Sequence, residues 1–172
     1  MSWRLRRASV DDAAAAALVA AATFLDTFAG VLAGPDIIAH VARKSSTDAF
    51  AAWISDPDSV VTLAEHEHGA APLGYSVLTR PDLPMQLGPQ DIELRRIYAL
   101  SRCQGQGLGA QLMERATEDA QTLGAQTLWL GVLATNARAR AFYERQGFML
   151  RGERRFLVGS TWFDDVVYAR EI

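Results

Sequence analysis

A glycine-rich segment in the middle of the chain constrains its fold more than any other feature. The strand-like stretch 92–100 leads into residues 104–109 (Gln-Gly-Gln-Gly-Leu-Gly), and apolar residues then recur at every fourth position from Leu108 to Ala120, as in a helix. Glycines between a strand and a helix expose backbone N–H groups to an anion, and the positive end of the helix dipole adds to the attraction. The segment therefore predicts a pyrophosphate site at the start of this helix.

Two well-known phosphate loops fit this segment poorly. The spacing Gly105-x-Gly107-x-x-Ala110 matches the dinucleotide fingerprint, but that motif requires an acidic residue at the end of the next strand. Here the next strand ends at 130–132 as Leu-Gly-Val. A Walker loop requires Gly-Lys-Ser or Gly-Lys-Thr, which this segment lacks. The remaining alternative is a turn whose glycines serve only packing.

Length and composition indicate one domain. The chain has 172 residues, of which 49% are hydrophobic, enough for one core but few for two. A single cysteine, Cys103, excludes an intrachain disulfide, so we expect residues 1–172 to form one cytoplasmic domain. The net charge of -3 argues against nucleic acid as a partner. The alanine-rich stretch 13–22 is too short to cross a membrane, so no membrane partner is expected.

The hydrophobic pattern predicts a mixture of strands and helices. Alternating or continuous apolar stretches predict strands at 3–7, 59–65, 73–78, 92–100 and 127–132, and a closing hairpin at 149–158 and 164–170. Helical spacing and capping residues predict helices at about 11–28, from 36 onward, around 48–53, at 108–123 and at 136–146. The strand 127–132 has apolar residues on both faces, so we expect it to be central and covered by helices on both sides.

A second motif follows that central strand. Residues 136–148 read Asn-Ala-Arg-Ala-Arg-Ala-Phe-Tyr-Glu-Arg-Gln-Gly-Phe, and Gln104, Gly107 and Gly109 fit the pattern (Gln or Arg)-x-x-Gly-x-(Gly or Ala). Together the two motifs resemble the GCN5-related N-acetyltransferase (GNAT) superfamily, over residues 59–168. Looser segments at 23–28, 92–98 and 156–159 resemble the polyamine-acetylating, PaiA-like branch and extend the match to most of the chain.

The resemblance implies an α/β fold of the GNAT type, a mixed, twisted sheet of six to seven strands flanked by about four helices. It implies acetyl-CoA as cosubstrate and no metal. In this family the fourth strand splays from its neighbour, and its free backbone groups hold the pantetheine arm and the acetyl carbonyl. The residues so implied in coenzyme binding are Ile97, Tyr98, Ala99, Gln104, Gly105, Gln106, Gly107, Leu108, Gly109, Ala110, Asn136 and Tyr143.

Acetyl transfer requires a neutral amine, a stabilised oxyanion and a proton for the departing thiolate. The resemblance implies Tyr143 as the general acid, because the family signature places a tyrosine near the coenzyme sulfur. The alternative for Tyr143 is a core aromatic, although we expect its neighbour Phe142 to fill the core. Glu93 is the implied general base, acting directly or through water. Its alternative is a structural carboxylate paired with Arg95.

The acceptor pocket is less well defined by the sequence. The PaiA-like resemblance implies Thr27, Phe28, Glu93 and Tyr98 there, although Phe28 fits a core position equally well. Asn136 on general grounds suits a helix N-cap. Phe156 and Trp162 fit either the core or a homodimer interface, because this family often pairs through its late strands.

The expected function is transfer of an acetyl group from acetyl-CoA to the primary amine of a small molecule. A polyamine is the acceptor that the resemblance suggests, and transfer is expected to be direct, within a ternary complex. Two alternatives stay open at this stage. One is acetylation of a protein N-terminus or lysine, and the other is a coenzyme-A-binding sensor module without catalysis.

Overall fold

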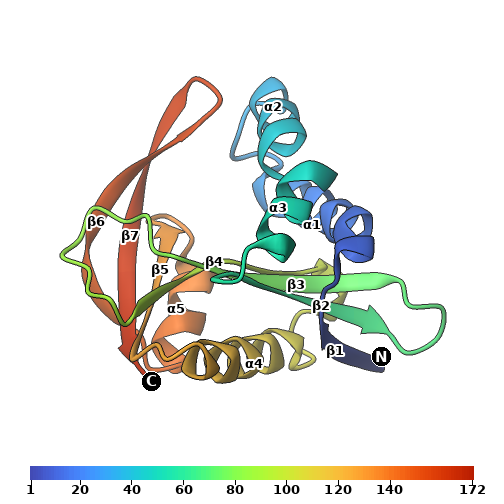
Figure 1. Ribbon diagram of the computed structural model, residues 1–172. Helices are drawn as coiled ribbons and strands as arrows, with labels where there is room; N and C mark the ends of the chain where they lie inside the picture. The colour runs from blue at the N-terminus through green and yellow to red at the C-terminus, as the bar shows by residue number, and fades with distance from the viewer.

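A single sheet of seven strands with helices on both faces forms the protein, in a computed structural model that describes residues 1–172 (Figure 1). The strands are β1 (Trp3–Arg7), β2 (Val60–His66), β3 (Pro72–Thr79), β4 (Asp91–Ala99), β5 (Thr127–Leu133), β6 (Met149–Val158) and β7 (Thr161–Glu171). The α-helices are α1 (Ala13–Phe28), α2 (Gly34–Lys44), α3 (Thr47–Ser55), α4 (Leu108–Thr122) and α5 (Ala137–Arg145). The expected mixed sheet is confirmed, with five α-helices around it.

The strand order is β1-β2-β3-β4-β5-β7-β6, and only the β4–β5 pair is parallel. That pair is short. Residues Asp91–Glu93 of β4 pair with Thr127–Trp129 of β5, whereas β4 continues to Ala99 and β5 to Leu133. The two central strands therefore diverge beyond Glu93 and Trp129. Beyond this point the two strands no longer pair with each other, and we call the gap between them the opening.

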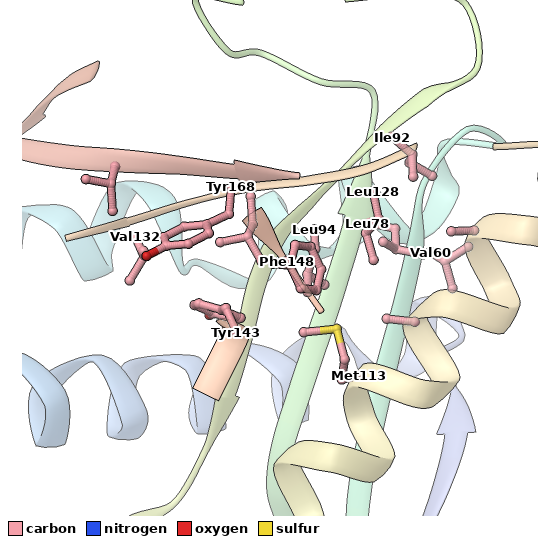
Figure 2. Close-up of a cluster of buried hydrophobic side chains, with 14 residues drawn as sticks. Val60, Leu78, Ile92, Leu94, Met113, Leu128, Val132, Tyr143, Phe148 and Tyr168 are labelled. Carbon is pink, nitrogen blue, oxygen red and sulfur yellow. The ribbon is translucent and has the colours of Figure 1, made fainter. Parts of the chain in front are cut away.

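Helices α1, α2 and α3 lie on one face of the sheet, and α4 and α5 lie on the other (Figure 1). We call these the α1 face and the α4 face. The larger core cluster lies on the α4 face, where Met113 of α4 packs with Leu94 of β4 and Leu128 of β5 (Figure 2). Burying each such side chain contributes about 1.5–3 kcal/mol. No helix combines the length and the apolar character of a bilayer-spanning segment.

A bulge in β4 changes which residues face each side of the sheet. Val77 of β3 pairs with Arg96, and the next residue, Leu78, pairs with Leu94, so Arg95 is the extra residue of a β-bulge. Leu94 before the bulge and Ile97 after it both pack against the cluster on the α4 face. Glu93 and Tyr98, which neighbour them in the strand, therefore both face α1.

Candidate active site

The predicted phosphate loop forms an uncapped helix start. Gly107 is the N-cap of α4 and has φ of 95°, with no side-chain cap, and Gly105 has φ of 76°. Residues other than glycine rarely adopt such positive φ angles. A Cβ atom at either position would meet nothing within 4 Å, so the space in front of the loop is open to a ligand.

Backbone donors point into that space. The first helical hydrogen bond of α4 runs from the Gln111 N–H to the Gly107 carbonyl, at 3.1 Å. The N–H groups of the three residues before Gln111 precede the helical ladder and are available to an anion; these are Leu108, Gly109 and Ala110. No acidic residue lies in the first turn, so nothing in the helix start opposes a pyrophosphate.

The remaining loop residues divide between solvent and core. Gln104 and Gln106 are exposed, and Gln106 Nε2 donates to the Arg102 carbonyl at 2.7 Å. Leu108 is fully buried. A Cβ at Gly109 would lie 3.7 Å from the Phe142 ring of α5, so the start of α4 lies against α5. Phe142, expected in the core, is half-buried and borders the loop as well as the core cluster.

Backbone groups of β4 line one wall of the opening. The Leu100 N–H donates to the Leu73 carbonyl of β3 at 2.9 Å. Because hydrogen-bonded and non-hydrogen-bonded positions alternate in an antiparallel pair, Tyr98 also directs its backbone groups toward β3. Ile97 and Ala99 direct theirs away from β3 and toward the opening. Of the three β4 residues implied in coenzyme binding, these two have unpaired backbone groups.

Tyr143 lies in the core cluster on the α4 face, with 9% of its surface exposed (Figure 2). Its ring centroid is 6.0 Å from that of Phe148. Burial, and to a lesser extent the nearby Tyr98, raise the pKa of the Tyr143 phenol above its ordinary value. The phenol therefore stays protonated at neutral pH and can act as a proton donor. Tyr143 therefore occupies the core position expected as the alternative, and its role as general acid stays a prediction.

Asn136 caps α5. Its Oδ1 atom accepts a hydrogen bond from the Ala139 N–H at 3.1 Å, as the general preference for Asn at N-caps predicts. The side-chain amide nitrogen is then the group of Asn136 left for a ligand.

Glu93 lies on the α1 face where the paired part of β4 ends, with only 3% of its surface exposed. Its Oε2 atom accepts hydrogen bonds from the Asp82 N–H and from Nη2 of Arg95, each at 2.8 Å. The ion pair with Arg95 that the sequence left open is therefore present. Oε1 makes no hydrogen bond to the protein, so one oxygen of this buried carboxylate is available to a proton or a water.

The residues implied in the acceptor pocket lie on the α1 face. Thr27 donates its hydroxyl proton to the Thr23 carbonyl at 2.7 Å, and Phe28 is half-buried with its ring 4.5 Å from that of Phe24. Phe24 in turn stacks on His40 of α2 at 4.2 Å. Burial, followed by the charges of nearby cations, lowers the pKa of His40 to about 4. This part of the α1 face is aromatic, and His40 is uncharged at neutral pH.

One charged pair on this face gives no signal in the sequence. Arg154 of β6 and Asp165 of β7 are register partners, and Nε of Arg154 lies 3.1 Å from Oδ2 of Asp165. The exposed side-chain fractions are 18% and 7%. Burial raises the pKa of Asp165, and Arg154 offsets this in part. Neither residue belongs to a local motif, so only the register of the hairpin shows that they meet.

The chain is similar to known acetyltransferases. Residues 32–148 match the model of the Acetyltransferase (GNAT) family. An uncharacterized N-acetyltransferase of Mycobacterium tuberculosis is 34% identical over 161 residues, which cover 94% of this chain and 98% of that relative.

Solved structures share the fold. The PaiA N-acetyltransferase of Thermoplasma acidophilum, in complex with coenzyme A, superposes with a TM-score of 0.81 at 21% identity, over the full length of both chains. The putative acetyltransferase YncA of Salmonella typhimurium, with acetyl-CoA, has a TM-score of 0.74 at 20% identity and covers 99% of this chain and 94% of that one.

Proposed function

This chain belongs to the acetyltransferase (GNAT) family of acetyl-CoA-dependent N-acetyltransferases, and we propose that it acetylates the primary amine of a small molecule by direct transfer in a ternary complex. One observation carries the proposal. The opening between β4 and β5 has an uncapped, glycine-rich helix start on the α4 face and a buried carboxylate, Glu93, on the α1 face. Two substrates can thus reach one point from opposite faces of the sheet.

The coenzyme side is assigned to backbone groups. The helix start at Gly107 would hold the pyrophosphate, since its free N–H groups and the helix dipole favour an anion. The unpaired backbone groups of Ile97 and Ala99 would hold the pantetheine arm and the acetyl carbonyl. Bound acetyl-CoA supplies the thioester whose acetyl group is transferred. An N–H donor aimed at the carbonyl oxygen stabilises the negative charge that develops there.

Two side chains would handle the protons. Glu93, through its free Oε1 atom or a water, would accept a proton from the acceptor ammonium, because only the neutral amine can attack a carbonyl. Tyr143 would donate its phenolic proton to the departing sulfur, since burial keeps this phenol protonated. Its position in a packed core holds the ring in one orientation.

For the acceptor, we propose only its chemical class. A polyamine is one candidate, suggested by the resemblance of residues 23–28, 92–98 and 156–159 to the PaiA-like branch. Thr27, Phe28 and Tyr98 would line the pocket on the α1 face beside Glu93. A peptide acceptor and a catalytically silent coenzyme sensor are the alternatives that the experiment must separate.

Calorimetric titration with acetyl-CoA, followed by thiol release in the same samples, tests the proposal. The acceptor panel contains spermidine, spermine, aminoglycosides, amino acids and peptides ending in lysine or a free N-terminus. We expect binding, and release with a small amine. Binding with release only for peptides would favour a protein acetyltransferase, and binding without release for any acceptor would favour a sensor. Absence of binding would contradict the assignment of residues 104–109.

The general base is tested by Glu93→Gln. This change preserves the size of the side chain but removes the carboxylate that would accept the proton. We expect kcat/KM to fall by about 100-fold or more at neutral pH and to recover partly at alkaline pH, where more of the amine is already neutral. An unchanged pH-rate profile would contradict the role. Asp82→Ala, which keeps the backbone N–H that binds Glu93, is the control.

A further inference from the structure

Among the buried and half-buried charged groups on the acceptor side of the opening, positive charges outnumber negative ones. On the α1 face of the central strands, Glu93 pairs with Arg95 and Asp165 pairs with Arg154, whereas Arg96 lacks a carboxylate partner and bonds to the Ser45 hydroxyl at 3.0 Å. Three guanidinium groups therefore face two carboxylates, each of them already paired. A polycation would find no free buried carboxylate here apart from one oxygen of Glu93.

Arg154 lies on the β5 wall of the opening. Gly131 is two residues beyond the last β4-paired residue of β5, and a Cβ built on it would lie 2.6 Å from Nη2 of Arg154 and 2.8 Å from Cζ. The guanidinium thus lies directly on the backbone of the part of β5 that does not pair with β4. Only glycine leaves room for it there.

The guanidinium of Arg154 is held in place but keeps free donors. Its Nε atom donates to Asp165, and Phe156 lies with its ring centroid 5.3 Å from Cζ, a cation–π contact. Neither Nη1 nor Nη2 donates to a protein acceptor. Two terminal nitrogens of a fixed, mostly buried guanidinium present the fork that binds a carboxylate bidentately.

A cavity of about 730 Å³ leads to this guanidinium, lined by β6, β7 and the segment before β4. Its carboxylates are Asp82, Glu153 and Asp164, which are exposed. Charges in water interact several-fold more weakly than charges near a protein interior. We therefore expect the mostly buried Arg154 to dominate recognition in the cavity, and the exposed carboxylates and the exposed Arg155 to contribute less.

We propose that Arg154 determines specificity by binding a carboxylate of the acceptor, so that the substrate is an amine that also carries a carboxylate, as an amino acid does. This inference rests on the proposed function, since it places the acceptor amine at Glu93 and the acceptor carboxylate at Arg154. It favours zwitterionic acceptors over polyamines.

Matched pairs of acceptors that differ only in the carboxylate test the proposal: lysine and cadaverine, arginine and agmatine, phenylalanine and phenethylamine. For wild type we expect kcat/KM to favour the carboxylate member of a pair by at least about tenfold, the ratio that one charge-assisted hydrogen bond typically supplies. The double variant Arg154→Gln, Asp165→Asn should bring the ratio toward one. Replacing both members of the pair leaves no unpaired buried charge. Gly131→Ala, which displaces the guanidinium, should also bring the ratio toward one.

Arg155→Gln is the matched control. Arg155 is the next residue of β6 and also lines the cavity, but 68% of its side chain is exposed. Because solvent screens its charge, this variant should keep most of the wild-type ratio. A wild-type preference for the decarboxylated amines, or a ratio that the Arg154 and Gly131 variants leave unchanged, would overturn the proposal.

A second readout separates this proposal from the proposed function. If acetyl-CoA binds but no amine of any pair is acetylated, direct transfer to a small amine fails. Calorimetric titration of coenzyme-A-saturated protein with N-acetyl-lysine then tests carboxylate binding by Arg154 independently of acetyl transfer. We expect at least about tenfold weaker binding to the double variant, and equal binding would overturn the assignment of Arg154.

Discussion

The two faces of the opening present different kinds of groups to a ligand. On the α4 face the donors are backbone N–H groups at Gly107 and along the unpaired edge of β4, with no charged side chain among them. On the α1 face the groups are charged side chains in pairs, Glu93 with Arg95 and Asp165 with Arg154. Backbone recognition depends on chain conformation and tolerates changes of side chain. Side-chain recognition changes with single substitutions.

This difference has a consequence for how the family diversifies. A coenzyme that is the same for every member can be held by conformation alone, which glycines and an unpaired strand provide. Acceptors differ between members, and a face made of side chains can be altered without disturbing the coenzyme site. We therefore expect substitutions on the α4 face to affect all acceptors equally and those on the α1 face to change their ranking.

The largest effect is expected for Tyr143→Phe. Loss of the hydroxyl should lower kcat about 100-fold for every acceptor, the usual contribution of a general acid, while acetyl-CoA affinity stays constant because the ring still fills its place in the core. Steady-state rates with two acceptors and calorimetry with acetyl-CoA measure both quantities.

Tyr168→Phe is the control for Tyr143→Phe. Tyr168 lies in the same cluster, and its hydroxyl bonds to Glu144 at 2.7 Å and Arg140 at 3.1 Å. Its loss should cost about 1 kcal/mol of stability without a comparable fall in kcat. A Tyr143→Phe enzyme with wild-type kcat would assign this tyrosine to the core alone.

A smaller effect is expected for Gly107→Val. The substitution strains a backbone with φ of 95° by about 1–2 kcal/mol and puts a branched side chain in front of the helix start. We expect the Kd for acetyl-CoA to rise at least about tenfold, whichever acceptor is present. Calorimetry measures this directly.

Gly124→Val separates strain from binding. Gly124 follows the other end of α4 and has φ of 83°, so the variant should lose similar stability and keep its affinity for acetyl-CoA. Equal losses of affinity in both variants would mean that the glycine loop acts only through folding.

The same contrast explains what the sequence could predict. The helix start after the glycine loop and the Asn136 cap were predicted correctly because each depends on residues within a few positions of one another. The Arg154–Asp165 pair depends on the β6–β7 register, and the turn of Tyr98 toward α1 depends on the bulge at Arg95. Both are set by packing across the sheet. The strand 127–132 proved central, but only its α4 face is fully buried in the core, and its residues on the α1 face are half-buried.

The smallest predicted effect concerns His40, which lies on the α1 face. Its folded-state pKa of about 4 is below its ordinary value of 6.5, so the unfolded chain binds the proton more readily between these values. The stabilisation is fully present above pH 6.5 and is lost as the pH falls toward 4. Allowing for solvent screening, we expect a loss of about 1–2 kcal/mol. Chemical denaturation across this pH range measures it.

His40→Phe should remove this part of the pH dependence, because a phenylalanine can stack on Phe24 without titrating. The cations that act on His40, namely Arg96, Lys44 and Arg43, stay charged throughout the range. Phe28→Leu is the control, since it removes the aromatic contact with Phe24 but leaves the stack of Phe24 on His40 in place, and should keep the wild-type slope. If His40→Phe also keeps that slope, His40 is accessible to protons in the folded state, and the aromatic wall of the acceptor side is more open than its burial indicates.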